Sequence, residues 1–371
     1  MGKRVVLGGL LVILAACGGH IEPDAAQSDS VPMPSRDAEQ GLYQPGKAGV
    51  PEHIADGVGT PSAIAVTDTH VIFTTHGTTI SGELVDAGAV FVADKRVGPA
   101  LMIAVDRQGA SFDALATDGT TAFVATSDAR LLSVPVAGGK TTTVATLEAA
   151  AVALAASGDY LYFATNAGAL ARVAKKGGTP DPLATITGAI RGLESDDVAV
   201  YVATGAAEEM PAGIVRVPLD GSAVRVLTSG KEPCAMIRDG RRLFWTSLAA
   251  STGAEPTSGK GEVLRLSLDG GDVATVASGA FTACAIAADK DNLYFATTVT
   301  NAGASTTIPG VKAGGSMGMT TGLGLMRAPI AGGVPIAVAE ATHALAQPGA
   351  VAVDASHLYW LTRTAVLRLR K

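Results

Sequence analysis

Apolar and polar residues alternate in short runs over residues 51–371, with the two-residue period of β-strands. The run 215–219 (VRVPL) is typical, and the turn signal Asp-Gly at 220–221 follows it before another alternating run begins. Gly-Gly pairs mark the same kind of turn at 138–139 and 270–271. β-branched residues are enriched in these runs, and no window has helical spacing. The pattern predicts an all-β domain of short antiparallel strands.

One of these runs repeats along the chain. It reads apolar, aromatic or apolar, aromatic or Val, small, then Thr or Ser, at intervals of roughly 40 to 65 residues. The seven copies lie at 71–75, 122–126, 161–165, 200–204, 243–247, 293–297 and 358–362. A strand precedes each copy, and a third and usually a fourth strand follow it. Four strands per repeat predict the blades of a seven-bladed β-propeller, with six or eight blades as the alternatives.

The two ends of the repeat region complement each other. The last copy is followed by only one further strand, at 366–369, so its blade lacks a fourth strand. Residues 52–57 align with the fourth-strand stretch 274–279 of an earlier repeat. We therefore expect the N-terminal strand to complete the last blade, which closes the ring and removes two exposed sheet edges.

The repeats also resemble a known family. Residues 244–247 (FWTS) and 359–362 (YWLT) are similar to degenerate YWTD repeats, which closely resemble repeats in uncharacterised bacterial propeller lipoproteins. The resemblance covers 51–371 and implies a propeller. The chain departs from the YWTD pattern in lacking the Asp of the motif, and YWTD rings usually have six blades.

The N-terminus has the pattern of an export signal. Lys3 and Arg4 precede an apolar run at 5–16, which is too short for a helix that spans a membrane. The run ends in Leu-Ala-Ala-Cys at 14–17 and resembles the lipobox of bacterial lipoproteins, which implies lipidation of Cys17. An ordinary secretory signal with an incidental cysteine is the alternative.

Three segments follow from this pattern: a signal peptide at 1–16, a lipidated cysteine with a flexible acidic tether at 17–50, and the propeller at 51–371. Gly18, rather than Asp, follows the cysteine. In a Gram-negative cell the resemblance therefore implies the outer membrane.

Composition limits the class of function. The chain has 371 residues, 47% of them hydrophobic and 17% charged, with a formal net charge of −6. Such a chain is neither a coiled coil nor a disordered segment, and it has no basic stripe for nucleic acid. The six histidines are dispersed, and neither a zinc spacing nor a nucleophile elbow is present. We therefore predict no catalytic residue, no metal and no cofactor.

Insertions concentrate between the second and third strands of a blade. They lie at 76–87, 205–212, 248–261 and 298–324, and all fall on one face of the ring. This face is the predicted binding face, although neutral drift of exposed loops would give the same pattern. The candidate contacts are His76, Glu208, Glu209, Glu255, Lys260, Lys312, Met317 and Met319.

The residue nine positions before each motif lies at the start of the innermost strand. These residues are Ser62, Asp113, Val152, Arg191, Cys234, Cys284 and Gly349. Ser62, Asp113 and Arg191 are the candidate ligand contacts at the mouth of the central channel. Cys234 and Cys284 occupy equivalent positions in neighbouring blades, which leaves three alternatives: a disulfide, two buried free thiols, or a metal or redox site.

Together these features predict a lipid-anchored propeller of the cell envelope that binds a protein, a peptide or a glycan without catalysis. Two alternatives stay open. One is an enzyme at the channel mouth, of the metal-dependent hydrolase or lactonase type. The other is an accessory subunit of an envelope assembly complex.

Overall fold

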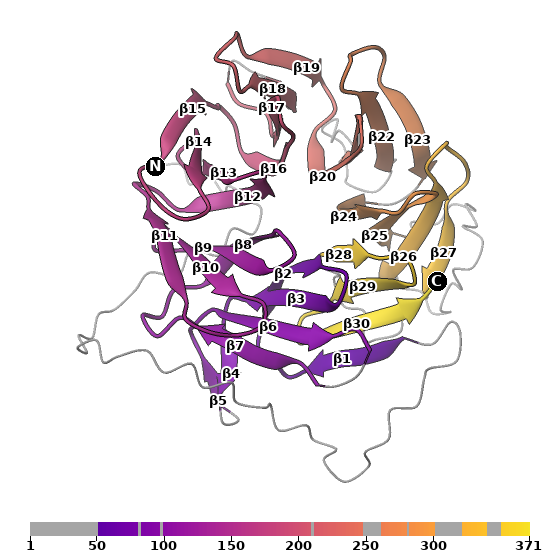
Figure 1. The fold of residues 1–371 in the computed structure, drawn as a ribbon. Helices are drawn as coiled ribbons and strands as arrows, with labels where there is room; N and C mark the ends of the chain where they lie inside the picture. Colours follow the sequence, from indigo (N-terminus) through magenta and orange to yellow (C-terminus); the bar gives the residue numbers. More distant parts are fainter. Residues whose placement is uncertain are drawn as a thin grey trace, which may run out of the picture.

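The computed structural model describes residues 51–80, 83–96, 99–208, 211–247, 261–279, 282–300, 321–339 and 350–371. Within these ranges, seven antiparallel sheets of four strands each form a ring (Figure 1). The predicted seven-bladed propeller is therefore confirmed. A further two-stranded sheet lies within the first blade's insertion.

Each blade is an antiparallel meander from an inner strand to an outer one, and the seven inner strands surround the ring axis (Figure 1). Blades 1 to 3 contain β2 (Pro61–Val66), β3 (His70–Thr75), β6 (Ala89–Asp94) and β7 (Leu101–Val105); β8 (Phe112–Thr117), β9 (Thr121–Thr126), β10 (Arg130–Pro135) and β11 (Thr142–Thr146); β12 (Ala151–Ser157), β13 (Tyr160–Thr165), β14 (Ala169–Ala174) and β15 (Asp181–Thr185). Blades 4 and 5 contain β16 (Ile190–Ser195), β17 (Ala199–Thr204), β18 (Gly213–Pro218) and β19 (Arg225–Ser229); β20 (Pro233–Asp239), β21 (Arg242–Ser247), β22 (Gly261–Ser267) and β23 (Ala274–Gly279). Blades 6 and 7 contain β24 (Thr282–Ala288), β25 (Asn292–Thr300), β26 (Thr321–Pro329) and β27 (Ile336–Ala339); β28 (Val351–Val353), β29 (His357–Leu361), β30 (Ala365–Arg370) and β1 (Glu52–Asp56).

The N-terminal strand completes blade 7, as the sequence predicts. Strand β1 pairs with β30, with Glu52 opposite Arg368 and Asp56 opposite Ala365. An ion pair of 2.7 Å joins Arg368 Nε to the Glu52 carboxylate, and the arginine is only 6% exposed. Residues far apart in the sequence are thus held together by a ladder of backbone hydrogen bonds and by a shielded charge pair.

The repeated motif is buried on both faces of the blade. In β13, Leu161 and Phe163 pack into a cluster with Phe123 of blade 2. Tyr162 and Ala164, which point the other way, pack with residues of blade 4 such as Val202. Because each blade is covered by its two neighbours, neither side of the second strand faces solvent. This explains why polar residues do not alternate with apolar ones in the motif.

The last residue of the motif has a structural role. In four blades its hydroxyl accepts a hydrogen bond from the first amide of the third strand, which closes the loop between the two strands. The pairs are Thr75 with Ala89 at 3.1 Å, Thr126 with Arg130 at 2.9 Å, Thr165 with Ala169 at 3.1 Å, and Thr362 with Ala365 at 3.0 Å. The recurring Thr therefore marks a turn in this framework.

Two predicted insertions contain regular structure that the sequence pattern did not indicate. In blade 1, β4 (Thr78–Ile80) and β5 (Glu83–Val85) pair as a small hairpin. In blade 6, β25 and β26 extend to nine residues each, and Thr300 lies opposite Thr321. The loop expected at 298–324 is therefore strand at both ends, because the two chains continue their pairing beyond the blade. Residues 301–320 lie outside the described ranges.

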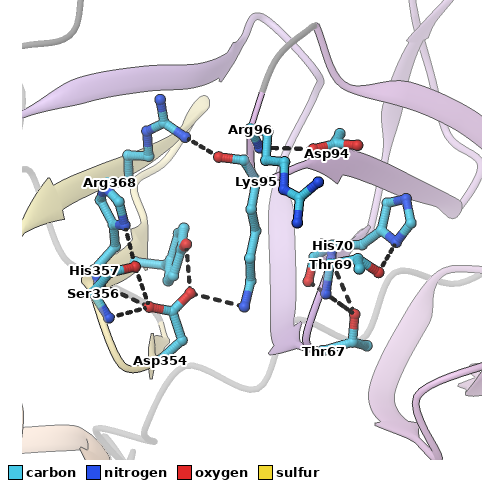
Figure 2. A network of polar contacts seen from close by, with 11 residues as sticks. Thr67, Thr69, His70, Asp94, Lys95, Arg96, Asp354, Ser356, His357 and Arg368 are labelled. Carbon is cyan, nitrogen blue, oxygen red and sulfur yellow. Dashed lines mark hydrogen bonds and ion pairs between the residues drawn. The ribbon is translucent and has the colours of Figure 1, made fainter.

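A lysine joins neighbouring blades at the turn between the first and second strands. In blade 7, Asp354 Oδ1 accepts hydrogen bonds from the amides of Ser356 and His357, at 2.7 and 2.8 Å. Its Oδ2 accepts the hydroxyl of Tyr359 at 2.8 Å and lies 2.8 Å from Nζ of Lys95, which comes from blade 1 (Figure 2). The ammonium also lies 6.0 Å from the centroid of the Tyr359 ring.

The same arrangement recurs at two other interfaces, and we call it the lysine latch. Lys175 of blade 3 lies 3.2 Å from Asp118 of blade 2 and 5.8 Å from the Phe123 ring. Lys371 of blade 7 pairs with Asp289 of blade 6 and lies 5.5 Å from the ring of Tyr294.

Each latch lysine directly follows the third strand of its blade. In every blade described, the backbone amide at this position donates a hydrogen bond to the turn between the first and second strands of its own blade. This bond fixes the position of the Cα atom from which the side chain extends. In the other four blades the position holds an apolar residue: Val136, Leu219, Leu268 and Ile330.

Loss of one latch is expected to weaken the ring measurably. Lys175→Met removes the pair with Asp118 and the contact with the Phe123 ring, and it should lower the free energy of unfolding by about 0.5–1 kcal/mol. Lys176→Met is the matched control, since Lys176 is the next residue and is exposed. Urea unfolding at low and high salt measures the free energy of unfolding of both variants. The difference between them should become smaller at high salt, because salt screens the ion pair. Equal stabilities of the two variants at low salt would contradict the latch.

Candidate functional site

In blades 1 to 6 the inner strand carries a β-bulge near its first residue. The register shifts lie between Pro61 and Ala63, Phe112 and Ala114, Ala151 and Ala153, Ile190 and Gly192, Pro233 and Ala235, and Ala283 and Ala285. The residue inside each shift has no cross-strand partner, so its side chain is turned out of the regular alternation. These residues are Ser62, Asp113, Val152, Arg191, Cys234 and Cys284, which we call the bulge ring.

The bulge ring contains six of the seven residues that lie nine positions before the motifs, among them the predicted channel-mouth contacts Ser62, Asp113 and Arg191; the seventh, Gly349, lies outside the described residues. Each bulge lies opposite the end of the second strand, as Pro61 lies opposite Thr75. The ring is therefore at the same end of the blades as the loops that carry the insertions. The described members of the loop set, His76 and Glu208, therefore share one face of the propeller with the bulge ring.

Two predicted residues from different sets lie together at blades 1 and 2. His76 Nδ1, at the start of the blade 1 insertion, lies 3.3 Å from Oδ1 of Asp113 in the bulge ring. The same Asp113 oxygen accepts a hydrogen bond of 2.7 Å from the hydroxyl of Ser111. The side chains of His76 and Asp113 are 50% and 26% exposed. This group presents a solvent-accessible carboxylate whose orientation is fixed from two sides.

Ser62 is hydrogen-bonded within the framework of the ring. Its hydroxyl donates to the carbonyl oxygen of Phe112 at 2.9 Å and is hydrogen-bonded to the Thr74 hydroxyl at 2.8 Å. The side chain thus joins blade 1 to the backbone of blade 2. This arrangement uses the hydroxyl within the framework.

Arg191 lies two blades along the ring from Asp113 and is paired. Its Nη2 is 3.2 Å from Oε1 of Glu232, the residue that precedes β20, and both side chains are about 40% exposed. Val152 of blade 3 separates Arg191 from Asp113 along the ring. Glu232 was not predicted from the sequence; its position just before an inner strand was the available signal.

Cys234 and Cys284 form a disulfide between blades 5 and 6, with Cα atoms 4.8 Å apart. Of the three alternatives left open by the sequence, the structure has the bridge. The bridge links residues that are 50 positions apart in the sequence. For a loop of this length, the loop-closure model gives a stabilisation of the folded state by about 4 kcal/mol.

The remaining predicted contacts are only partly described. Glu208 is exposed in the loop between the second and third strands of blade 4. Cys17, Glu209, Glu255, Lys260, Lys312, Met317 and Met319 lie outside the described residues, and predictions about them stay predictions. Among the side chains that the structure does describe, no group of three or more His, Cys, Asp or Glu residues is placed to hold a metal ion. The same part of the chain contains no helix long and apolar enough to cross a membrane.

The opposite face contains a cavity of about 510 Å³ between blades 6 and 7. Charged side chains from both blades line it, among them Asp289, Arg327, Asp354 and Lys371. Asp289 and Lys371 pair with each other in one latch, and Asp354 belongs to the next. Asp289, Asp354 and Lys371 are therefore engaged in holding the blades together.

Glu194 is a titratable group at the interface of blades 4 and 5. It lies on β16 opposite Tyr201, whose ring packs with Met236 of blade 5. Burial raises the pKa of the Glu194 carboxyl to about 7, and attraction to Arg238 together with a hydrogen bond from its backbone amide offsets only part of this effect. The carboxyl is therefore partly protonated near neutral pH.

No protein-family model matches the sequence, and no curated protein matches it. Several solved structures are similar in fold. YCF48 bound to D1 peptide aligns with a TM-score of 0.57 at 11% identity, covering 87% of this chain and 96% of that one. BamB from Moraxella catarrhalis aligns with a TM-score of 0.52 at 13% identity, covering 88% and 98%.

The GH74 enzyme of Niastella koreensis has a TM-score of 0.60 at 15% identity, with 85% of this chain and 53% of the enzyme covered. This chain thus spans about half the length of that enzyme. At such identities the likeness establishes the fold alone, and that fold is a β-propeller.

The pH dependence of stability tests the protonation of Glu194. Its pKa in the folded state lies above the ordinary value of 4.5. Its contribution to stability is therefore full below pH 4.5 and is lost as the pH rises through about 7. Glu194→Gln cannot ionise, so above pH 7 it should exceed wild type by about 1–3 kcal/mol in the free energy of unfolding.

Urea unfolding between pH 4 and pH 8 measures this difference. Glu148→Gln, at an exposed position, serves as the control and should follow the wild-type profile. If the free energy of unfolding of wild type and of Glu194→Gln changed with pH in the same way, the pKa of the Glu194 carboxyl would not be raised in the folded protein.

Proposed function

We propose that this chain is a non-catalytic binding propeller that takes a protein or peptide segment at the bulge ring. The observation that carries the proposal is the contrast between repeated and varied positions within the seven blades. The framework positions repeat their chemistry, with buried aromatic residues and a loop-closing Thr. The bulge position repeats only its geometry. Its six described residues include an acid, a base, an alcohol, an aliphatic group and a disulfide. A surface with constant shape and varied chemistry favours recognition of one particular partner.

The exposed charges of the ring suit a polypeptide partner. The Asp113 carboxylate lies beside the His76 imidazole, and Arg191 pairs with Glu232, so each charge of the bulge ring has a polar neighbour before a partner arrives. Paired charges are held in defined orientations, and such groups contribute specificity when an interface forms around them. Between them Val152 offers a part-buried apolar side chain. Together they match the mixed polar and apolar character of protein surfaces.

The structural comparisons support this proposal only at the level of the fold. One similar structure, YCF48, was solved with a peptide bound, so a fold of this kind accommodates a peptide in that protein. The present chain's partner is to be found by experiment. A glycan is the other ligand class that the sequence left open.

We also propose that the chain is anchored in the cell envelope through a lipid on Cys17. The support is the sequence alone: a basic start, an apolar run at 5–16 and the lipobox-like residues 14–17. In a Gram-negative cell this anchor would hold a YWTD-like propeller at the outer membrane. Several acyl chains on one cysteine give stable attachment.

Site-directed crosslinking tests where the partner binds. A photoreactive amino acid placed at His76 should give a discrete adduct in cells, whereas the same group at Ser222 should not. Ser222 is exposed in the turn between β18 and β19, on the opposite face. In the crosslinker-bearing chain, Asp113→Asn combined with Arg191→Ala should reduce the adduct by at least about fivefold, since charged hydrogen bonds to a partner would be lost.

Mass spectrometry identifies the adduct, and binding is then measured between the purified chain and that component. Equal adducts from both faces would argue against a site at the bulge ring. So would an adduct at His76 that persists undiminished in the double variant.

Metabolic labelling with a radioactive fatty acid tests the anchor. The wild-type chain should incorporate label and sediment with membranes, and Cys17→Ser should do neither, because the acceptor thiol is gone. Cys234→Ser is the control and should keep the label, since that cysteine is in the propeller. Label in the Cys17→Ser chain, or its absence from wild type, would refute lipidation at this site.

A further inference from the structure

The disulfide of blades 5 and 6 lies within the bulge ring. Cys234 and Cys284 are the extra residues of their strands, and neither takes part in the cross-strand pairing of its own blade. Their side chains are therefore turned out of the regular alternation of their strands. The bridge joins two inner strands at the face that carries the insertions.

The two sulfur-bearing residues differ in exposure. Cys284 is exposed, although the residues on either side of it, Ala283 and Ala285, are 1% and 5% exposed. Cys234 is part-buried. A reagent that approaches from solvent therefore meets the Cys284 side first. Exposed disulfides are the ones that exchange readily with thiols, whereas fully enclosed ones resist reduction.

The fold around the bridge does not depend on it for packing. An apolar cluster between blades 5 and 6 includes Phe244, Ile286, Phe295 and Met326, each no more than 6% exposed. The ring itself is closed elsewhere, by β1 on β30. Opening the bridge thus removes a covalent link between two inner strands while the interface beneath it stays covered.

We propose that the Cys234–Cys284 bridge is a thiol–disulfide exchange site for a small-molecule thiol that enters at the bulge ring. The thiolate of the small molecule attacks Sγ of Cys284 and forms a mixed disulfide there. The bond between the two protein sulfurs breaks, and Cys234 leaves as a thiolate that takes a proton from water. A second thiol attacks the small-molecule sulfur of the mixed disulfide, which releases the oxidised small molecule and leaves Cys284 as a thiol. Two electrons pass from the two small thiols to the bridge.

This proposal is independent of partner binding at the bulge ring. It concerns only which sulfur reacts and whether the folded ring permits the reaction. Failure of the exchange experiment leaves the proposed binding function untouched, and the reverse also holds.

The test uses the full chain carrying Cys17→Ser, so that the bridge cysteines are the only two present. The oxidised protein is incubated with millimolar reduced glutathione without denaturant, alkylated, and analysed by peptide mass spectrometry. We expect glutathione on Cys284 and the alkyl group on Cys234, in at least about tenfold excess over the reverse. The far-UV circular dichroism should stay that of the oxidised protein.

Any of three results would overturn the proposal. The bridge could stay closed until denaturant is added, the adduct could form mainly on Cys234, or reduction could unfold the ring. A second measurement compares single variants in the same background. Cys234→Ser leaves Cys284 free, and it should react with an aromatic disulfide reagent about tenfold faster than Cys284→Ser does. Equal rates for two folded variants would also contradict the exposure argument.

Discussion

The structure depends on burying both faces of every blade. A four-stranded sheet with apolar residues on both sides is stable only when both sides are covered, and a ring of blades meets this condition without a separate covering layer. The second strand shows the constraint most clearly, since Leu161 and Tyr162 pack toward opposite neighbours. A ring also needs a closed seam. Here β1 on β30, with Arg368 paired to Glu52, provides it.

The same constraint explains where chemistry is placed. Side chains in the sheets are committed to packing between blades, so variation is confined to positions outside the regular pairing. The bulges of the inner strands and the loops beside them are such positions, and they meet at one end of the ring. His76 and Asp113 show the result, because one comes from a loop and the other from a bulge. The opposite end contains the lysine latches, whose charges hold adjacent blades together.

Much of the fold was accessible from the sequence because propeller repeats are local. The motif at 161–165 and its turn signals lie within one blade, so period and spacing predict the blade directly. The bulge ring was also located, since a constant offset from the motif selects it. Sequence analysis missed Lys95, Lys175 and Lys371 as cross-blade partners, because a lysine after a strand looks like any exposed lysine until the neighbouring turn is placed beside it. It likewise did not indicate the β4–β5 hairpin.

The sequence alone determined the strand order within a blade and the closure of the ring, and it favoured seven blades over six or eight, because each follows from the pattern of the repeats. Only the tertiary structure decided which side chains meet across blades: His76 with Asp113, Arg191 with Glu232, and Cys234 with Cys284. These contacts depend on the rotation between adjacent sheets and on the bulge that turns each inner residue. The rotation between adjacent sheets is not encoded in the spacing of residues along the chain, since it arises when two separately formed blades pack together.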